Sequence, residues 1–220
     1  MTAFPGSPRV LKAGLVLVNP ATGQLLRVIS VQYNPDTLSR TLQVQSAAGG
    51  ENADHSAALR LKGAAIETIK LEAQLDLTDQ LEAPDQHPTA LRLGLHPQLA
   101  VLEALAYPSS GDLLANDRLA ASGTMEVLPV ETPLTLFVWG RNRVAPVRLT
   151  DLSVTEEAFD AALNPIRAKV SLGLRVLSVD DLGFAHRGGV LFLGYLRAKE
   201  AFARKSAAVP LSRLGLEALP

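Results

Sequence analysis

Hydrophobic and polar residues alternate along several stretches of this 220-residue chain. In the clearest case, residues 68–78 (TIKLEAQLDLT), every second residue is apolar and the residues between are polar. Residues 166–176 (IRAKVSLGLRV) repeat the pattern. A strand with one face in a core and the other in water has this alternation, whereas a helix with the same sequence would have no continuous apolar side. We therefore predict a mainly β fold built from half-buried strands.

Further segments with strand-like composition raise the expected number of strands to about seven. They lie at residues 13–19, 24–34, 39–45, 133–140 and in the run PVRLTDLSV, 146–154. Residues 133–140 are apolar on both faces and should be the more buried. In the run 146–154 the apolar phase slips between Leu149 and Leu152. One extra residue near Asp151 would produce this slip, so we predict a β-bulge there.

A corner is predicted where residues 31–40 read VQYNPDTLSR. Pro35 cannot donate to a β ladder, so no central strand passes through it. Asn34, Pro35 and Asp36 suit the first three positions of a type I turn. We expect a hairpin-like corner between the strands on either side.

One helix is well signalled in the sequence GLHPQLAVLEALAYP, residues 94–108. Pro97 suits a first helical turn and Pro108 follows the helix end. Leucines recur along one face, as in a helix that buries a single side. We expect this helix to pack across the sheet or to plug the end of a barrel. Residues 46–64 and 107–124 are both expected to be loops.

A second helix is predicted from about Val190 to Arg204, with the glycines at 188–189 as a hinge before it. We divide the chain into a barrel domain, residues 1–180, and a C-terminal helical arm and tail, residues 181–220.

Composition limits the classes of partner. The formal net charge is −1, so no field of one sign attracts nucleic acid or an anionic membrane. Cysteine is absent, which excludes disulfides, thiolate catalysis and Cys-ligated zinc. The N-terminus lacks a secretory pattern, and the longest apolar run elsewhere, residues 190–196, is far shorter than the ~20 residues of a membrane-spanning helix. We expect a cytoplasmic protein.

Residues that carry chemistry are sparse. The four histidines form no short-range ligand pair, and neither a phosphate loop nor a nucleophile elbow is present. We assign no catalytic, cofactor-binding or metal-binding residue. The alternative is a β-sandwich enzyme or carbohydrate-binding module that acts alone. Such a protein would need a polar cluster assembled by folding, for example from Asp54, His55, Asp85 and His87.

Four stretches, taken in order, resemble one family. They are residues 31–40, 69–79, 94–108 and 133–177. Over roughly residues 10–180 the chain resembles the tube-like baseplate adaptor proteins of contractile injection systems, the phage-tail-like particles of bacteria. The resemblance implies an antiparallel, tube-protein-like β-barrel or sandwich with one packed helix. It also implies a homohexameric ring that joins the inner tube and spike hub to the baseplate.

The same resemblance implies the partners: other copies of the chain, the spike or hub protein, the inner-tube protein and baseplate wedge proteins. Many family members carry a C-terminal LysM module, but no two-strand, two-helix pattern follows Leu182. This chain ends in the predicted helix, which has little chain left to bury its apolar side. We expect that helix to dock on a baseplate partner. The expected docking residues are Leu191, Phe192, Tyr195, Leu196 and Phe202.

The inner-tube subunit of the same particle is a second alternative. The extra helix and tail argue against it, because tube rings must stack identically many times.

Overall fold

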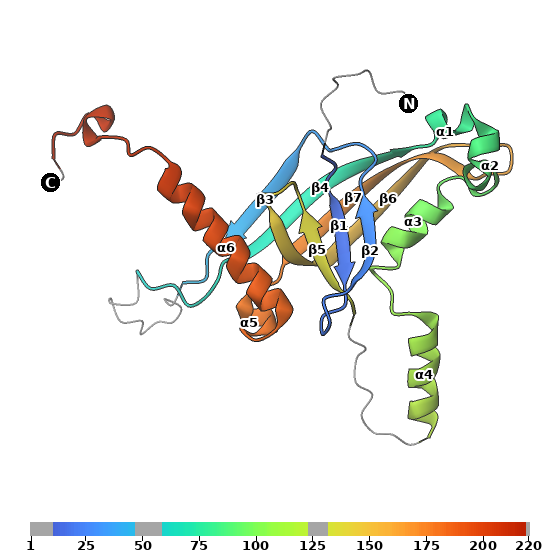
Figure 1. Ribbon diagram of the computed structural model, residues 1–220, viewed down its shortest axis with the longest axis horizontal. Helices are drawn as coiled ribbons and strands as arrows, with labels where there is room; N and C mark the ends of the chain where they lie inside the picture. Colours follow the sequence, from blue (N-terminus) through green and yellow to red (C-terminus); the bar gives the residue numbers. More distant parts are fainter. Residues whose placement is uncertain (1–10, 47–58, 123–131, 219–220) are drawn as a thin grey trace, which may run out of the picture.

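The computed structural model describes residues 11–46, 59–122 and 132–218. Its main element is one antiparallel sheet of seven strands in the order β2-β1-β5-β6-β7-β4-β3 (Figure 1). The strands are β1 (Gly14–Val18), β2 (Leu25–Ser30), β3 (Leu38–Gln43), β4 (Ile66–Asp76), β5 (Leu134–Val138), β6 (Val144–Phe159) and β7 (Pro165–Val176). This confirms the predicted mainly β class.

Strands β4 and β7 form the centre of the core, as their alternation predicts. They pair antiparallel with Leu71 opposite Leu172 and Ala73 opposite Val170. The apolar side chains at every second position of both strands are buried and belong to one hydrophobic cluster. Burial of each large apolar side chain contributes about 1.5–3 kcal/mol, so these two strands fix which face of the sheet points inward.

The predicted β-bulge is confirmed in β6. The register of the β6–β7 pair shifts between Leu149 and Asp151. Gly173 lies opposite the bulge, where a Cβ would come within 3.0 Å of the Asp151 Cβ. The bulged strand therefore approaches β7 closely enough to favour glycine at this position.

The sheet must be strongly curled. Its two terminal strands, β2 and β3, are consecutive in the chain, so one short segment has to connect the two edges. In a flat seven-stranded sheet β2 and β3 would lie roughly 29 Å apart at about 4.8 Å per strand. Residues 31–37 connect them and bend on the way, so they cannot span that distance fully extended. The expected hairpin between these strands is wrong: β2 and β3 do not pair but lie at opposite edges.

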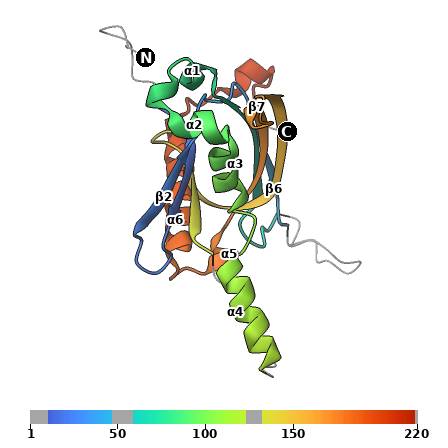
Figure 2. The ribbon, with the colours of Figure 1, turned by 90° about the vertical axis from the view of Figure 1, so that its right-hand side faces the viewer.

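The remaining elements are short helices and one long one. They are α1 (Thr78–Leu81), η2 (Pro84–Gln86), α2 (Pro88–Leu93), α3 (His96–Glu103), α4 (Ser110–Ala121), α5 (Val179–Leu182), α6 (Arg187–Lys205) and η3 (Leu211–Leu214). Helix α3 is the first predicted helix, and it lies within the curve of the sheet (Figure 2). Its Leu99 and Leu102 are buried in the same cluster as β4 and β7.

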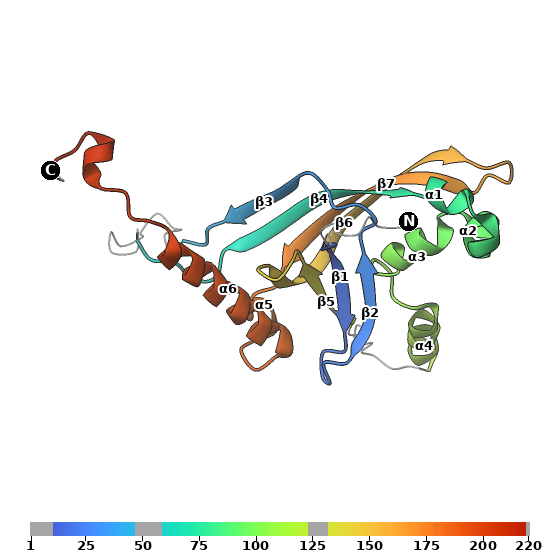
Figure 3. The same ribbon diagram turned by 45° about the horizontal axis from the view of Figure 1, so that its top comes forward.

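The expected loop at 107–124 contains a helix instead. Helix α4 projects from the body of the molecule and has no buried residue (Figures 1 and 3). Hydrophobic periodicity does not reveal this helix in the sequence, because no side of it packs on the core. The local signal is the cap: the Ser109 Oγ accepts a hydrogen bond from the Asp112 N–H at 3.1 Å.

Helix α6 begins earlier than expected, at Arg187, so the glycines at 188–189 are not a hinge. Both are buried in the first helical turn, and His186 caps that turn by accepting a hydrogen bond from the Gly188 N–H at 3.1 Å. A Cβ on Gly189 would lie 2.0 Å from the carbonyl oxygen of Gly183. Close packing against the preceding segment explains the glycine here.

Candidate assembly interface

The segment that joins β2 to β3 holds the curled sheet together through two side-chain amides. The Gln32 amide donates to the Asp76 carbonyl at 2.6 Å and accepts from the Asp76 N–H at 2.9 Å. The Asn34 amide likewise accepts from the Ala13 N–H at 2.9 Å and donates to the Leu11 carbonyl at 2.7 Å. Each amide therefore pairs with backbone groups in the way that a neighbouring strand would, although the segment that joins β2 to β3 is not itself a strand.

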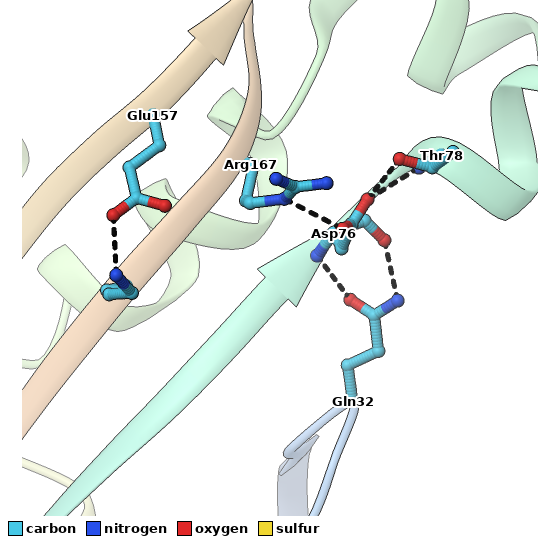
Figure 4. A network of polar contacts seen from close by, with 6 residues as sticks. Gln32, Asp76, Thr78, Glu157 and Arg167 are labelled. Atoms are coloured by element: carbon cyan, nitrogen blue, oxygen red, sulfur yellow. Dashed lines mark hydrogen bonds and ion pairs between the residues drawn. The ribbon is translucent and has the colours of Figure 1, made fainter.

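Asp76 is the centre of a polar network at the end of β4 (Figure 4). Its carboxylate accepts hydrogen bonds from the Thr78 hydroxyl at 2.5 Å and the Thr78 N–H at 2.8 Å, and it lies 2.9 Å from the Arg167 Nε. The Thr78 hydrogen bonds, with a smaller effect from Arg167, lower the pKa of Asp76. The ionised carboxylate thus joins the chain turn after β4 to strand β7.

The terminal strands β2 and β3 expose apolar side chains. Leu25, Leu26 and Val28 of β2 are each about half exposed, as are Leu42 on β3 and Val44 just after it. Apolar side chains on terminal strands favour pairing with another chain unless they are covered. Most of the neighbouring segment 46–64, residues 47–58, lies outside the described residues.

A buried carboxylate anchors α6 to the sheet. Glu67 of β4 is 3% exposed although it is ionisable. Its carboxylate lies 2.7 Å from the Arg40 guanidinium and 2.6 Å from the Lys199 ammonium, and it accepts a hydrogen bond from the Tyr195 hydroxyl at 2.9 Å. The Lys199 ammonium also lies 4.1 Å from the centre of the Tyr195 ring. These contacts fix the direction in which α6 leaves the body.

The pKa shifts follow from this arrangement. Burial alone would raise the pKa of Glu67, but the hydrogen bonds from Lys199, Arg40 and Tyr195 hold it below its ordinary value. Burial, together with the hydrogen bond to Glu67, raises the pKa of Tyr195 to about 12. At neutral pH the cluster is therefore a charged carboxylate held by two cations and a neutral phenol.

The expected docking residues divide between the core and the surface. Phe192 and Tyr195 are buried in the chain's own hydrophobic cluster. Leu191 is half-buried, whereas Leu196 and Phe202 are exposed. Phe192 and Tyr195 lie on the helix face that meets the sheet, and Phe202 continues that face by helical spacing. Leu196 and Phe202, with part of Leu191, thus remain open to a neighbour.

A cavity of about 460 Å³ lies between α3 and the β1–β2 side of the sheet. Its walls are mostly apolar, with side chains such as Leu15, Phe137 and Val101. Gln98 is among the lining residues, and its Oε1 atom is buried with no hydrogen-bond partner among the described residues. A convergent set of titratable groups, which an enzyme of the alternative class would need, is not among the residues that line this cavity.

The polar cluster expected for the alternative enzyme or carbohydrate-binding module is not formed among the described residues. Asp54 and His55 lie outside the described residues, while Asp85 and His87 are exposed near α2. Over the described ranges, no group of three or more His, Asp or Glu side chains is placed to hold a metal ion. No helix in those ranges is long and apolar enough to cross a membrane.

The contacts of Glu67, Gln32 and Asn34 are not among those predicted from the sequence. Glu67 has a recognisable signal, because it occupies the buried phase of the β4 alternation, two residues before Ile69. A charged residue in a core phase predicts a buried ion pair. The two amides have no such signal, since their partners are backbone groups 21 to 44 residues away.

Comparison with known proteins identifies the family. The family model described as contractile injection system tube protein matches residues 16–181. Among solved structures, a tail of an empty gene transfer agent (GTA) particle with C6 symmetry is similar at TM-score 0.30 and 11% identity, over 80% of this chain and 95% of that one. The virion of a native GTA particle is similar at TM-score 0.29 and 8% identity, with the same coverage. No curated protein matches this chain.

The family match covers about three quarters of the chain and all seven strands except the first two residues of β1. The chain therefore belongs to the contractile injection system tube protein family and is a structural component of a phage-tail-like particle.

Proposed function

We propose that this protein forms a homohexameric ring that joins the inner tube and spike hub of a contractile injection system to its baseplate. Neighbouring subunits meet through the β2 side of one copy and the β3 side of the next. Two different surfaces in contact make the interface heterologous, as a closed ring requires.

The observation that carries this proposal is the pair of terminal strands with exposed apolar residues. An isolated subunit leaves Leu26 on β2 and Leu42 on β3 in water. Ring closure covers both edges with copies of the same chain, in the way that a closed barrel removes the edges of its sheet. Obligate interfaces of this kind commonly bury about 2,000 Å² or more.

The adaptor role, rather than that of an inner-tube subunit, is supported by what lies beyond the family match. The match ends at residue 181, and α6 follows with a tail that runs away from the body (Figure 1). An appendage of this kind suits a ring that occurs once and meets different neighbours on its two sides. Residues 1–180 are the ring-forming part in this proposal, and residues 181–220 are its helical extension.

Docking on the baseplate uses the apolar side chains of α6 that its own sheet does not cover. Leu196 and Phe202, with half-buried Leu191, form the proposed contact, while Phe192 and Tyr195 hold the helix to its own sheet. The partners are the spike or hub protein, the inner-tube protein and the wedge proteins. Assembly takes place in the cytoplasm, without nucleic acid and without insertion into a membrane.

Counting copies tests the role. Quantitative mass spectrometry of purified particles should give six copies of this chain for each spike. A ratio that grows with particle length would instead make it the inner-tube subunit.

The edge contact has its own test. The Leu42→Lys variant should shift the purified protein from rings to monomers, because a charged residue on an edge strand opposes pairing. The matched control is Leu119→Lys on α4, which is equally exposed and should leave rings intact. Rings of unchanged mass in the Leu42→Lys variant would overturn the edge contact.

A further inference from the structure

The C-terminal arm, residues 204–218, is an exposed basic segment with apolar side chains. Every residue of it is exposed, and Leu214 is 72% exposed. It carries one acidic residue, Glu217, against three basic ones. The basic residues are Arg204, Lys205 and Arg213. A segment of this composition is suited to an acidic surface that also offers some apolar area.

An acidic surface lies at the opposite end of the molecule, on α1 and η2 (Figures 1 and 3). Asp79, Glu82 and Asp85 are exposed there, and residues 78–86 contain no Lys or Arg. Leu91 and Leu93 of α2 add exposed apolar area beside them. Within the described ranges, neither these three carboxylates nor the three basic residues of the arm take part in an ion pair.

The acidic end is also hollowed. A recess of about 190 Å³ lies among α1, η2 and α2, and its lining includes Gln80, Gln86, His87 and Gln98. The unpartnered Oε1 atom belongs to this last residue. An arginine carries five N–H donors and no acceptor, so a guanidinium suits a recess lined by side-chain amides, with Asp79 and Asp85 next to the lining residues Gln80 and Gln86 in the chain.

We propose that the C-terminal arm of one copy docks on the acidic α1–η2 end of a second copy, with Arg213 directed into the recess. The proposal rests on the ring of the proposed function and names a second contact between its subunits. The arm cannot reach the acidic end of its own chain, because the Glu67 cluster fixes α6 toward the other end of the long axis (Figure 1). Contact between complementary opposite ends is heterologous, as ring closure requires.

Charge reversal on each side tests the contact in the full-length chain. The first variant combines Arg204→Glu, Lys205→Glu and Arg213→Glu. The second combines Asp79→Lys, Glu82→Lys and Asp85→Lys, and a third carries all six changes. The control reverses three exposed basic residues elsewhere, namely Lys12, Arg118 and Arg141. Circular dichroism checks the fold of each variant, and sedimentation measures the concentration at which rings dissociate.

We expect each three-residue reversal to raise that concentration at least tenfold at low salt. The six-residue variant should recover most of the loss, because its charges are again complementary. Rings unchanged by either reversal, or a six-residue variant no better than the other two, would overturn the arm contact and leave the hexameric ring standing. A wild-type chain that stays monomeric at all concentrations would overturn both.

Discussion

One apolar face runs along both halves of α6, but the surroundings of the two halves differ. In the leading half, Phe192 and Tyr195 are buried against the sheet, and Lys199 reaches the Glu67 carboxylate. In the trailing half, Phe202 continues that face but is 46% exposed, because the helix runs past the end of the sheet. An apolar face is therefore not by itself a docking surface. Only the part that the chain's own core leaves uncovered is open to a neighbour.

The largest expected effect comes from the leading half. The Phe192→Ala variant should lower the free energy of unfolding by about 3–5 kcal/mol, since it empties a core position. Urea denaturation followed by circular dichroism measures it. A loss below about 1 kcal/mol would mean that the leading half is not part of the core.

Removal of the buried carboxylate should come next. Glu67→Ala leaves two cations and the Tyr195 hydroxyl without their acceptor. Breaking a buried pair costs about 3–5 kcal/mol, and the partial exposure of the Arg40 and Lys199 side chains reduces this to roughly 2–3. Glu67→Gln, which keeps an acceptor but no charge, should lose less. A Glu67→Gln variant as stable as the wild-type protein would show that the charge contributes nothing.

Substitutions at two glycines of α6 distinguish a glycine that close packing requires from one that does not touch a neighbour. Gly189→Ala should destabilise the fold by about 1–3 kcal/mol, because the new methyl group collides with the Gly183 carbonyl. Gly194→Ala, where a Cβ meets nothing within 4 Å, should stabilise it by roughly 0.5–1 kcal/mol. If Gly189→Ala were also stabilising, the hinge reading of residues 188–189 would return.

Acid should loosen the leading half of α6. The pKa of Glu67 is lowered in the fold, so its contribution is present above the ordinary glutamate pKa of about 4.3 and is lost as the pH falls below it. Limited proteolysis in a pH series from 5 to 3 should release α6 before the sheet unfolds, and only below about pH 4.3. The Glu67→Gln variant should show no such pH dependence in this range, and an identical profile for both proteins would contradict the assignment.

The smallest effect on folding is expected in the trailing half. Phe202→Ala should change the free energy of unfolding by less than about 0.5 kcal/mol, as is usual for an exposed site. The same change should nonetheless weaken incorporation into particles, measured by competition with the wild-type chain. Normal incorporation would argue that the trailing half meets no neighbour.

The sequence predicts best where one face of an element packs on the core. The alternation in β4 and β7, the phase slip at Asp151 and the leucine face of α3 all record that packing. It predicts poorly where structure depends on distant partners or none. Helix α4 packs on nothing, and the curl of the sheet depends on Gln32 bonding to a backbone 44 residues away. The expected docking residues divide between core and surface for the same reason, since only the fold shows which side of α6 its own sheet covers.

Hydrogen–deuterium exchange along α6, in dilute monomer and in assembled particles, tests the central claim most directly. We predict that amides near Phe192 and Tyr195 are protected in both forms, whereas those of residues 201–205 exchange quickly in the monomer and become protected in the particle. Rapid exchange along the whole helix in the monomer, or a trailing end that stays unprotected in the particle, would contradict the account.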